Sequence, residues 1–231
     1  LADHSNNGQY PLSMLLDVFQ SIQRKGMRFI LALTGLPTLF PKLVEARTFA
    51  ERMFRVLSLN SLTEQASIQA ILNPIRSAAP PICHSFTEED ALLVFQTTKG
   101  YPYFIQYFCR EIFDVWVQAL NNSQLPRSVP NDEIIQKLDA DFFAGRWAKA
   151  TDRQRELLQI VALLPNSDEE FTVQEIVSHP SNKTQTKAFT NSHISQLFIL
   201  LAAAGLVYKN RRGKYSFAVP LLGEFIRRQA S

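Results

Sequence analysis

Apolar positions follow one another without alternation from Phe29 to Leu33, and Thr34 and Gly35 close the run. A short apolar run with no period predicts a strand buried on both faces, as in a parallel sheet. A helix beginning at Pro11 is predicted before it. Ligands of such sheets bind just past the carboxyl end of a strand, which puts Thr34 at the expected site. One strand makes no sheet, so either the chain starts inside a domain or a partner supplies the rest.

Helical spacing dominates the part of the chain that follows. Helices are predicted from Pro41, from a capping box at Ser61–Glu64 to near Pro74, from Thr87 to Lys99, and from Tyr101 to about Leu120. A short second strand is predicted at Arg55–Leu59. The last three of these helices have apolar faces that fit a compact helical bundle.

The segment Asn121–Pro130 is predicted to be a linker, because Asn, Ser and Pro are concentrated in it. Helices are predicted beyond it, through Ile134 and Leu138, after the caps Thr151 and Thr172, and from Asn191 to about Ala204. A β-hairpin with Arg211-Arg212-Gly213 in its turn follows, and Pro220 opens a final helix. Three helices and then a hairpin is the order of a winged helix-turn-helix.

The composition indicates a globular chain, with 46% hydrophobic and 19% charged residues. Its net charge of +3 is unevenly spread, since residues 180–231 carry Glu224 as their single acid. The basic residues there are Lys183, Lys187, Lys209, Arg211, Arg212, Lys214, Arg227 and Arg228. This excess favours an anionic partner such as nucleic acid, although a solvated basic surface is the alternative. Neither a signal pattern nor a membrane span is seen, and two lone cysteines fit a reducing, cytoplasmic setting.

Three stretches resemble AAA+ or STAND-type P-loop ATPases, in particular the origin-recognition-like branch of bacteria and archaea. They are Arg28–Leu39, Arg52–Arg55 and Gly100–Tyr103, and the ending Phe217–Phe225 adds to the likeness. The resemblance implies a mainly α fold with a little β, in three parts. Residues 1–60 would be the C-terminal remnant of an α/β ATPase core, residues 61–125 a helical lid, and residues 126–231 a winged-helix domain.

The chain departs from that family in lacking a GxxxxGK[ST] loop and an apolar strand that ends in adjacent acids. The resemblance therefore implies that Leu1 lies just past the magnesium-binding strand of a longer ATPase. ATP and Mg²⁺ would belong to that full-length parent. This fragment is expected to need no cofactor, to hold no metal, to hydrolyse no ATP, and to show no micromolar ATP binding by calorimetry.

The resemblance also assigns roles to particular residues. Thr34 matches the sensor-1 position, which orients water near the γ-phosphate; a Thr that bonds a turn is the alternative. Arg52 matches the arginine finger, with Arg55 as its rival, and a surface arginine is the alternative. Gly100, Tyr103 and Gln106 fall at a degenerate sensor 2, where the family's nucleotide-contacting arginine is absent.

The predicted winged helix supplies a candidate nucleic-acid-binding set. It consists of Lys183, Lys187, Asn191, Ser192, His193, Gln196, Lys209, Arg211, Arg212 and Lys214. The recognition helix Asn191–Gly205 contains no Lys or Arg, so backbone contacts are favoured over base readout. Its residues Ile194, Leu197, Leu200 and Leu201 are assigned to the core.

Other kinds of site find little support. The sequence shows no Ser/His/Asp set and no HExxH, and Asp139 and Asp141 are expected to lie on a solvated face without partners. The leading hypothesis is the lid and winged-helix portion of a nucleotide-dependent ATPase, with the winged helix binding DNA or relaying nucleotide state to a partner. The alternatives are a protein–protein interaction module and, less favoured, a stand-alone transcription regulator. Oligomerisation is a property that the parent could have.

Overall fold

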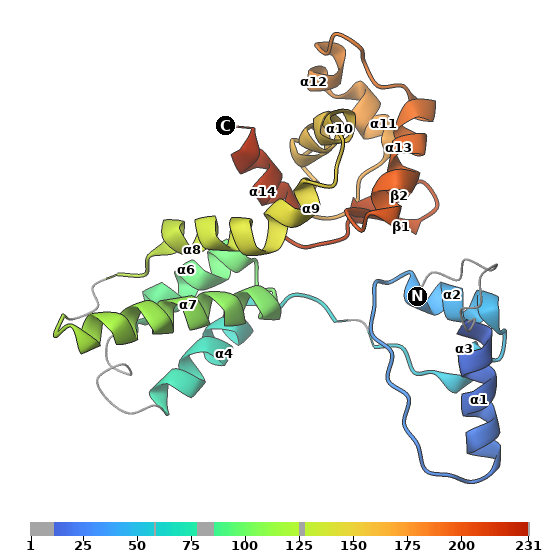
Figure 1. Ribbon diagram of the computed structural model, residues 1–231, viewed down its shortest axis with the longest axis horizontal. Helices are drawn as coiled ribbons and strands as arrows, with labels where there is room; N and C mark the ends of the chain where they lie inside the picture. Colours follow the sequence, from blue (N-terminus) through green and yellow to red (C-terminus); the bar gives the residue numbers. More distant parts are fainter. Residues whose placement is uncertain (1–11, 58, 78–85, 125–127, 231) are drawn as a thin grey trace. The chain divides into compact units, whose positions relative to one another are not determined.

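The computed structural model describes residues 12–57, 59–77, 86–124 and 128–230. They are mainly helical with a single two-stranded sheet, which confirms the expected class of mainly α with a little β. The chain divides into two compact units, Leu1–Leu59 and Asn60–Ser231. Figure 1 labels the elements of both.

The first unit is a small group of helices. They are α1 (Leu12–Arg24), α2 (Leu39–Ala46) and α3 (Ala50–Met53). Leu16, Leu43 and Ala50 form its buried centre. Arg47 donates two hydrogen bonds to the Asp17 carboxylate, at 2.9 and 2.6 Å, so this ion pair ties the end of α2 to α1. Pro11, the predicted start of the first helix, lies outside the described residues.

The predicted buried strand at Phe29–Leu33 is wrong. Residues 27–36 have neither helix nor strand, and Phe29 and Ile30 are 56% and 94% exposed. The second predicted strand, Arg55–Leu59, is also absent where it is described. A strand needs a neighbour for its N–H and C=O groups, and no described segment pairs with either stretch. These short apolar runs have the sequence pattern of buried strands. The described chain, however, contains no sheet in which they could be buried.

The second unit begins with a helical bundle. Its helices are α4 (Glu64–Arg76), α6 (Glu88–Thr98) and α7 (Pro102–Asn121), which lie side by side in Figure 1. Thr87 caps α6 in a reciprocal capping box with Asp90, as predicted. The capping box at Ser61–Glu64 is wrong by two residues, because Thr63 is the cap and its hydroxyl accepts from the Ala66 N–H.

Three consecutive elements lead out of the bundle: α8 (Asn131–Leu138), the π-helix η1 (Asp139–Ala144) and α9 (Gly145–Trp147). Figure 1 shows them running on as one length of helix. A π-helical turn inside an α-helix is uncommon and often marks a functional position. Here it falls where the bundle meets the elements that follow.

The remaining elements form what we call the hairpin region. They are α10 (Asp152–Ala162), α11 (Val173–Ser178), α12 (Pro180–Lys183), α13 (Asn191–Ala203), β1 (Val207–Arg211), β2 (Lys214–Phe217) and α14 (Leu222–Gln229). Capping boxes at Thr151 and Thr172 begin α10 and α11, as predicted. The predicted hairpin is confirmed, with Val207 opposite Phe217, and Phe171 bridges to the far side of β2 at Tyr215.

The bundle and the hairpin region share one hydrophobic core. Its buried residues run from Ile71 on α4 through Phe108 on α7 to Leu157 on α10 and Ile226 on α14. Burial of side chains this size contributes roughly 1.5–3 kcal/mol each. Residues 60–231 are therefore stabilised as one body.

Candidate functional site

The residues expected to serve ATP chemistry in the first unit are exposed and separate. Thr34 lies in a segment without regular structure, Arg52 is in the last turn of α3, and Arg55 follows it. No hydrogen bond or ion pair of the described residues joins any two of them. The structure supplies the three side chains and does not assemble them into a site.

Gly100, which the resemblance placed at sensor 2, lies in a tight turn between α6 and α7. It has φ +75°, and its carbonyl accepts a hydrogen bond from the Leu62 N–H at 2.8 Å. A Cβ at this position would lie 2.2 Å from the Leu62 carbonyl oxygen. Lys99 before it is also left-handed, with φ 53°. The α6–α7 turn is therefore held against the start of α4 by close backbone packing that glycine permits.

Tyr103 and Gln106 point outward from the start of α7. Both are exposed, and the Tyr103 ring packs against Phe104 and Phe142 with centroids 5.3 Å away. No polar contact of the described residues joins Gly100, Tyr103 and Gln106 into a cluster. What the start of α7 offers in this structure is an aromatic contact with η1.

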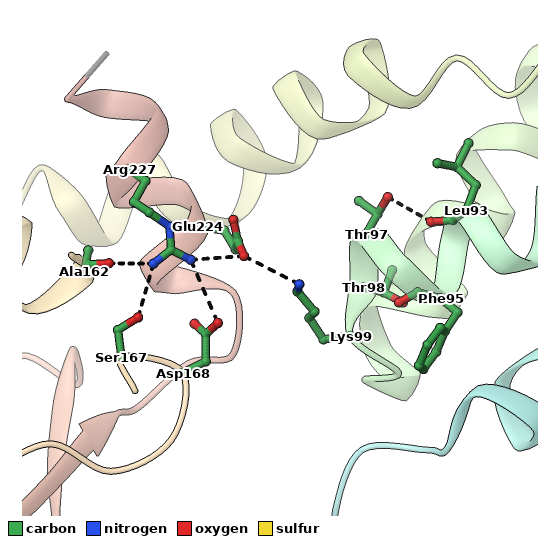
Figure 2. Close-up of polar contacts among 10 residues, drawn as sticks. All are labelled: Leu93, Phe95, Thr97, Thr98, Lys99, Ala162, Ser167, Asp168, Glu224 and Arg227. Atoms are coloured by element: carbon green, nitrogen blue, oxygen red, sulfur yellow. Dashed lines mark hydrogen bonds and ion pairs between the residues drawn. The ribbon is translucent and has the colours of Figure 1, made fainter. Parts of the chain in front are cut away.

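A polar network surrounds Arg227 on α14, as Figure 2 shows. Its Nη1 donates to the Ala162 carbonyl at 2.5 Å and to Ser167 Oγ at 3.1 Å. Its Nη2 lies 3.0 Å from Glu224 Oε1 and 3.9 Å from Asp168 Oδ2. The Arg227 side chain, about one-third exposed, thus ties α14 to the end of α10 and the loop that follows.

Glu224 extends this network to the bundle. Its Oε1 lies 3.8 Å from Lys99 Nζ, in the left-handed turn after α6. Thr97 and Thr98 hold the end of α6 by hydrogen bonds to the Leu93 and Val94 carbonyls, at 2.9 and 2.7 Å. The charged path from Lys99 to Arg227 therefore crosses from the bundle to the hairpin region. The Lys99–Glu224 pair is long and half-exposed, so it contributes little stability on its own.

An aromatic stack makes the same connection in the core. Phe104 on α7 lies 5.3 Å from Phe142 and 6.1 Å from Phe143, the two consecutive phenylalanines of η1. Phe143 stacks on Phe225 of α14 at 5.2 Å. Aromatic pairs at these distances add roughly 0.5–1.5 kcal/mol each beyond their burial. Both phenylalanines of η1 therefore contact Phe104.

Asp139 and Asp141 are not the unpartnered surface acids that the sequence predicted. Asp139 accepts two hydrogen bonds from Arg228 on α14, at 2.8 and 2.6 Å, and Asp141 accepts from the Tyr107 hydroxyl on α7 at 3.1 Å. Burial, together with this bond to Asp141, raises the pKa of Tyr107. The prediction failed because both partners come from distant parts of the sequence.

We call the meeting place of these contacts the junction. A cavity of about 170 Å³ lies in it, lined by Gln96, Thr97, Lys99, Ile135, Leu138, Leu221, Glu224 and Arg228. A larger cavity, of about 410 Å³, lies between α7 and α8, where Lys137 Nζ is 2.6 Å from Glu111. The bond to Glu111 raises the pKa of Lys137. None of the predicted nucleotide residues lines either cavity.

The α13 residues of the predicted nucleic-acid set share an exposed end of that helix. Asn191, Ser192 and Gln196 are exposed there, whereas His193 is half-buried with its ring 5.4 Å from Phe189. Thr190 caps the helix by accepting from the His193 N–H at 3.3 Å. The first turns of α13 therefore present uncharged polar groups.

The basic members of that set differ in their freedom. Arg211 donates to Glu170 at 3.1 and 2.7 Å, and this bond holds the pKa of Glu170 below its usual range. Lys209 and Arg212 are exposed and make no ion pair with the described residues. Lys183 and Lys187 are exposed near α12, and Lys214 is half-buried on β2. On the hairpin, Lys209 and Arg212 are thus exposed without an ion pair among the described residues, whereas Arg211 is already paired with Glu170.

The core assignment of Leu200 is wrong. Leu200 is 56% exposed and its neighbour Ile199 is 70% exposed. Leu201 is buried as predicted, and Phe198, which was not assigned to the core, is buried as well, with its ring 4.5 Å from the Tyr215 ring of β2. The exposed face of α13 therefore changes from polar in its first half to apolar in its second half.

Comparison with known proteins gives one family match. Residues 140–226 match the family model of a domain of unknown function (DUF8462), which spans the chain from η1 to α14. No curated protein and no solved structure matches the chain. Within the described part of the chain, no helix has the length and apolarity to cross a membrane, and no three His, Cys, Asp or Glu residues gather to hold a metal ion.

Proposed function

We propose that this chain is the lid and winged-helix portion of a nucleotide-dependent AAA+ or STAND-like ATPase. In this proposal α4, α6 and α7 are the lid, and the hairpin region is the winged helix. The exposed apolar side chains of Phe29, Ile30, Leu57 and Leu59 support the ATPase-core part, because residues that pack against the rest of such a core would be exposed without it. Hydrolysis would require the phosphate-binding elements of the parent.

The lid and the winged helix act as one rigid relay of nucleotide state. The observation that carries this proposal is the aromatic stack from Phe104 through Phe143 to Phe225, which joins α7 to α14 through a single core. A rearrangement at the start of α7 would displace the winged helix with it, because packed cores transmit displacement instead of absorbing it. The ion pairs of Asp139 and Glu224 brace the same junction.

The two tryptophans allow a direct test of rigid coupling. Trp116 lies on α7 and Trp147 on α9, so Trp147→Phe and Trp116→Phe variants each leave one fluorescent reporter. We expect each reporter to unfold in urea at the same midpoint as the far-ultraviolet circular dichroism. Adding Phe143→Ala should lower the urea midpoint of both reporters together. The change should correspond to a loss of roughly 3–5 kcal/mol in the free energy of unfolding.

Two separate transitions would contradict the relay. A matched control is Phe113→Ala on α7, where the side chain is 51% exposed and lies outside the stack. Added to either single-tryptophan variant, that change should alter the free energy of unfolding by no more than about 0.5 kcal/mol, so both midpoints should stay nearly unchanged.

DNA is the partner class that a second observation favours. Lys209 and Arg212 are exposed on the hairpin without an ion pair in the described chain, and the first turns of α13 present Asn191, Ser192 and Gln196. Cations on a wing hold phosphates, and polar groups on a helix contact backbone or base edges. Because α13 carries no Lys or Arg, we propose binding of low sequence specificity.

Fluorescence anisotropy with a labelled DNA duplex tests this proposal across a salt series. The Lys209→Ala/Arg212→Ala double variant should bind DNA more weakly. The slope of log K plotted against the logarithm of the salt concentration should also become less steep, by about two. Arg110→Ala on α7 is the control, since Arg110 is an exposed cation of the lid. Absence of binding at low salt, or equal loss in the control, would contradict DNA binding and favour the protein-interaction alternative.

A further inference from the structure

A short segment without helix or strand, residues 184–190, joins α12 to α13 and carries Lys187. We call it the α12–α13 loop. Its Phe189 side chain is buried, and so is Asn182 just before the loop. Asn182 accepts the Phe189 N–H at 2.7 Å and donates to the Phe189 and Val177 carbonyls, at 3.1 and 3.2 Å. One buried amide therefore fixes the end of the loop that leads into α13.

Arg153 of α10 holds the loop at Lys187. Its guanidinium carbon lies 3.6 Å from the centroid of the Phe189 ring, and its Nη2 donates a hydrogen bond to the Lys187 carbonyl. Its Nη1 donates to Glu156 at 2.5 Å. Among the described residues, no other hydrogen bond or ion pair involves Lys187. The polar contact that fixes the Lys187 backbone thus comes from Arg153.

Phe189 also connects Arg153 to the first turn of α13. The Phe189 ring lies 5.4 Å from the ring of His193, whose N–H is accepted by the Thr190 cap. Arg153 therefore contacts one member of the predicted nucleic-acid set, Lys187, and reaches a second, His193, through the Phe189 ring.

We propose that Arg153 is a positioning residue that holds Lys187 in place for a DNA phosphate. This inference rests on the DNA binding proposed above. A cation whose backbone is already fixed loses less conformational freedom when DNA binds, so the affinity is higher. The Arg153 guanidinium is half-buried and bonded to Glu156 and to the Lys187 carbonyl, so Arg153 itself is not assigned a phosphate contact.

Arg155, two residues further along α10, is a matched control. Its Nε and Nη2 donate to the Trp147 and Ala148 carbonyls, both at 3.3 Å, and its guanidinium carbon lies 5.6 Å from the Trp147 ring. Its Nη1 is 3.6 Å from Asp152. Arg155 thus makes the same kinds of contact as Arg153, and none of these partners belongs to the α12–α13 loop.

Fluorescence anisotropy with a labelled DNA duplex, over a salt series, tests the positioning role. Lysine keeps the charge of Arg153 but lacks the planar guanidinium that stacks on a ring while it bonds two acceptors. Arg153→Lys should therefore weaken DNA binding by about fivefold or more at each salt concentration. Arg155→Lys should bind DNA as the wild type does.

The salt slope separates positioning from contact. Lys187→Ala should make the slope of log K against the logarithm of the salt concentration less steep, by about one. Arg153→Gln, which removes the charge, should weaken binding as Arg153→Lys does and leave that slope unchanged. A slope reduced by about one in Arg153→Gln would make Arg153 a phosphate contact, and the positioning role would be wrong.

Thermal unfolding separates positioning from stability. Arg153→Lys and Arg155→Lys each lose hydrogen bonds, so both should have a lower thermal midpoint than the wild type. DNA binding is then measured well below the lowest midpoint, where every variant is folded. A merely structural role of Arg153 would lower the midpoint and leave the DNA affinity of the folded chain unchanged.

Two results would overturn the positioning role while leaving DNA binding in place. One is a DNA affinity of Arg153→Lys equal to that of the wild type, and the other is an equal loss of affinity in Arg155→Lys. Absence of DNA binding by the wild type at low salt would instead contradict the proposed function, and this inference with it.

Discussion

At Gly100, backbone conformation and close packing both favour glycine. Its φ of +75° favours glycine, and an added Cβ would lie 2.2 Å from the Leu62 carbonyl oxygen. The same residue accepts the Leu62 N–H at 2.8 Å. The turn that carries Lys99 toward Glu224 therefore depends on this position.

We expect Gly100→Ala to destabilise the protein by more than about 3 kcal/mol. A left-handed residue with a Cβ costs about 1–2 kcal/mol. Moving Leu62 away from that Cβ would also cost local packing and the hydrogen bond from the Leu62 N–H to the residue-100 carbonyl, about 1 kcal/mol. Gly213→Ala is the matched control, because Gly213 has the same φ of +75° and open space around it. Urea unfolding should give a loss of only about 1–2 kcal/mol for the control, and equal losses would refute the packing argument.

At the scale of single residues, the sequence indicates which charged side chains are present but not which residues they pair with. Asp139 was predicted to be solvated, yet it pairs with Arg228, 89 residues away. Arg227 bonds the Ala162 carbonyl from 65 residues away. Such pairs depend on tertiary packing, and nothing in the local pattern around Asp139 or Arg227 indicates them.

At the scale of elements, local chemistry was a good guide. The caps at Thr87, Thr151 and Thr172 each begin a helix, because side-chain and backbone groups three residues apart satisfy one another. The strand at Phe29–Leu33 failed for the opposite reason, since strand formation requires a neighbour that the described chain does not provide. The starts of these helices could therefore be predicted from the local sequence, whereas the buried strand could not.

The hairpin should lose stability in acid through Glu170. Hydrogen bonds from Arg211, with its positive charge, hold the pKa of Glu170 below that of an unfolded glutamate, about 4.3. The unfolded chain then binds the proton more readily, so this contribution is present above that pKa and is lost as the pH falls through the folded value. The ion pair therefore stabilises the hairpin at neutral pH and ceases to do so in acid.

Thermal unfolding between pH 7 and pH 3 checks this expectation. The wild-type midpoint should fall with pH more steeply than that of Glu170→Gln, which cannot titrate at this position. Glu169→Gln, with an exposed neighbouring acid, is the control and should follow the wild type. Parallel curves for wild type and Glu170→Gln would mean that the Glu170–Arg211 pair does not stabilise the folded hairpin.

At the scale of the whole molecule, the organising feature is the continuous core of residues 60–231. The sequence indicated a bundle and a helix–hairpin segment, joined by a linker at Asn121–Pro130. The structure adds η1, whose Phe142 and Phe143 meet Phe104, and α14, whose Phe225 completes the stack. The sequence could not indicate this sharing, because it is set by how aromatic side chains far apart in the chain pack together.

Hydrogen exchange of Phe225→Ala, followed peptide by peptide, tests this central claim most directly. If residues 60–231 are one cooperative body, the slowest amides of α7 should exchange faster by the same factor as those of α10, although Phe225 lies on α14. The factor should correspond to the roughly 3–5 kcal/mol expected for removing a buried phenylalanine ring. Faster exchange in α10 with unchanged protection in α7 would contradict the account.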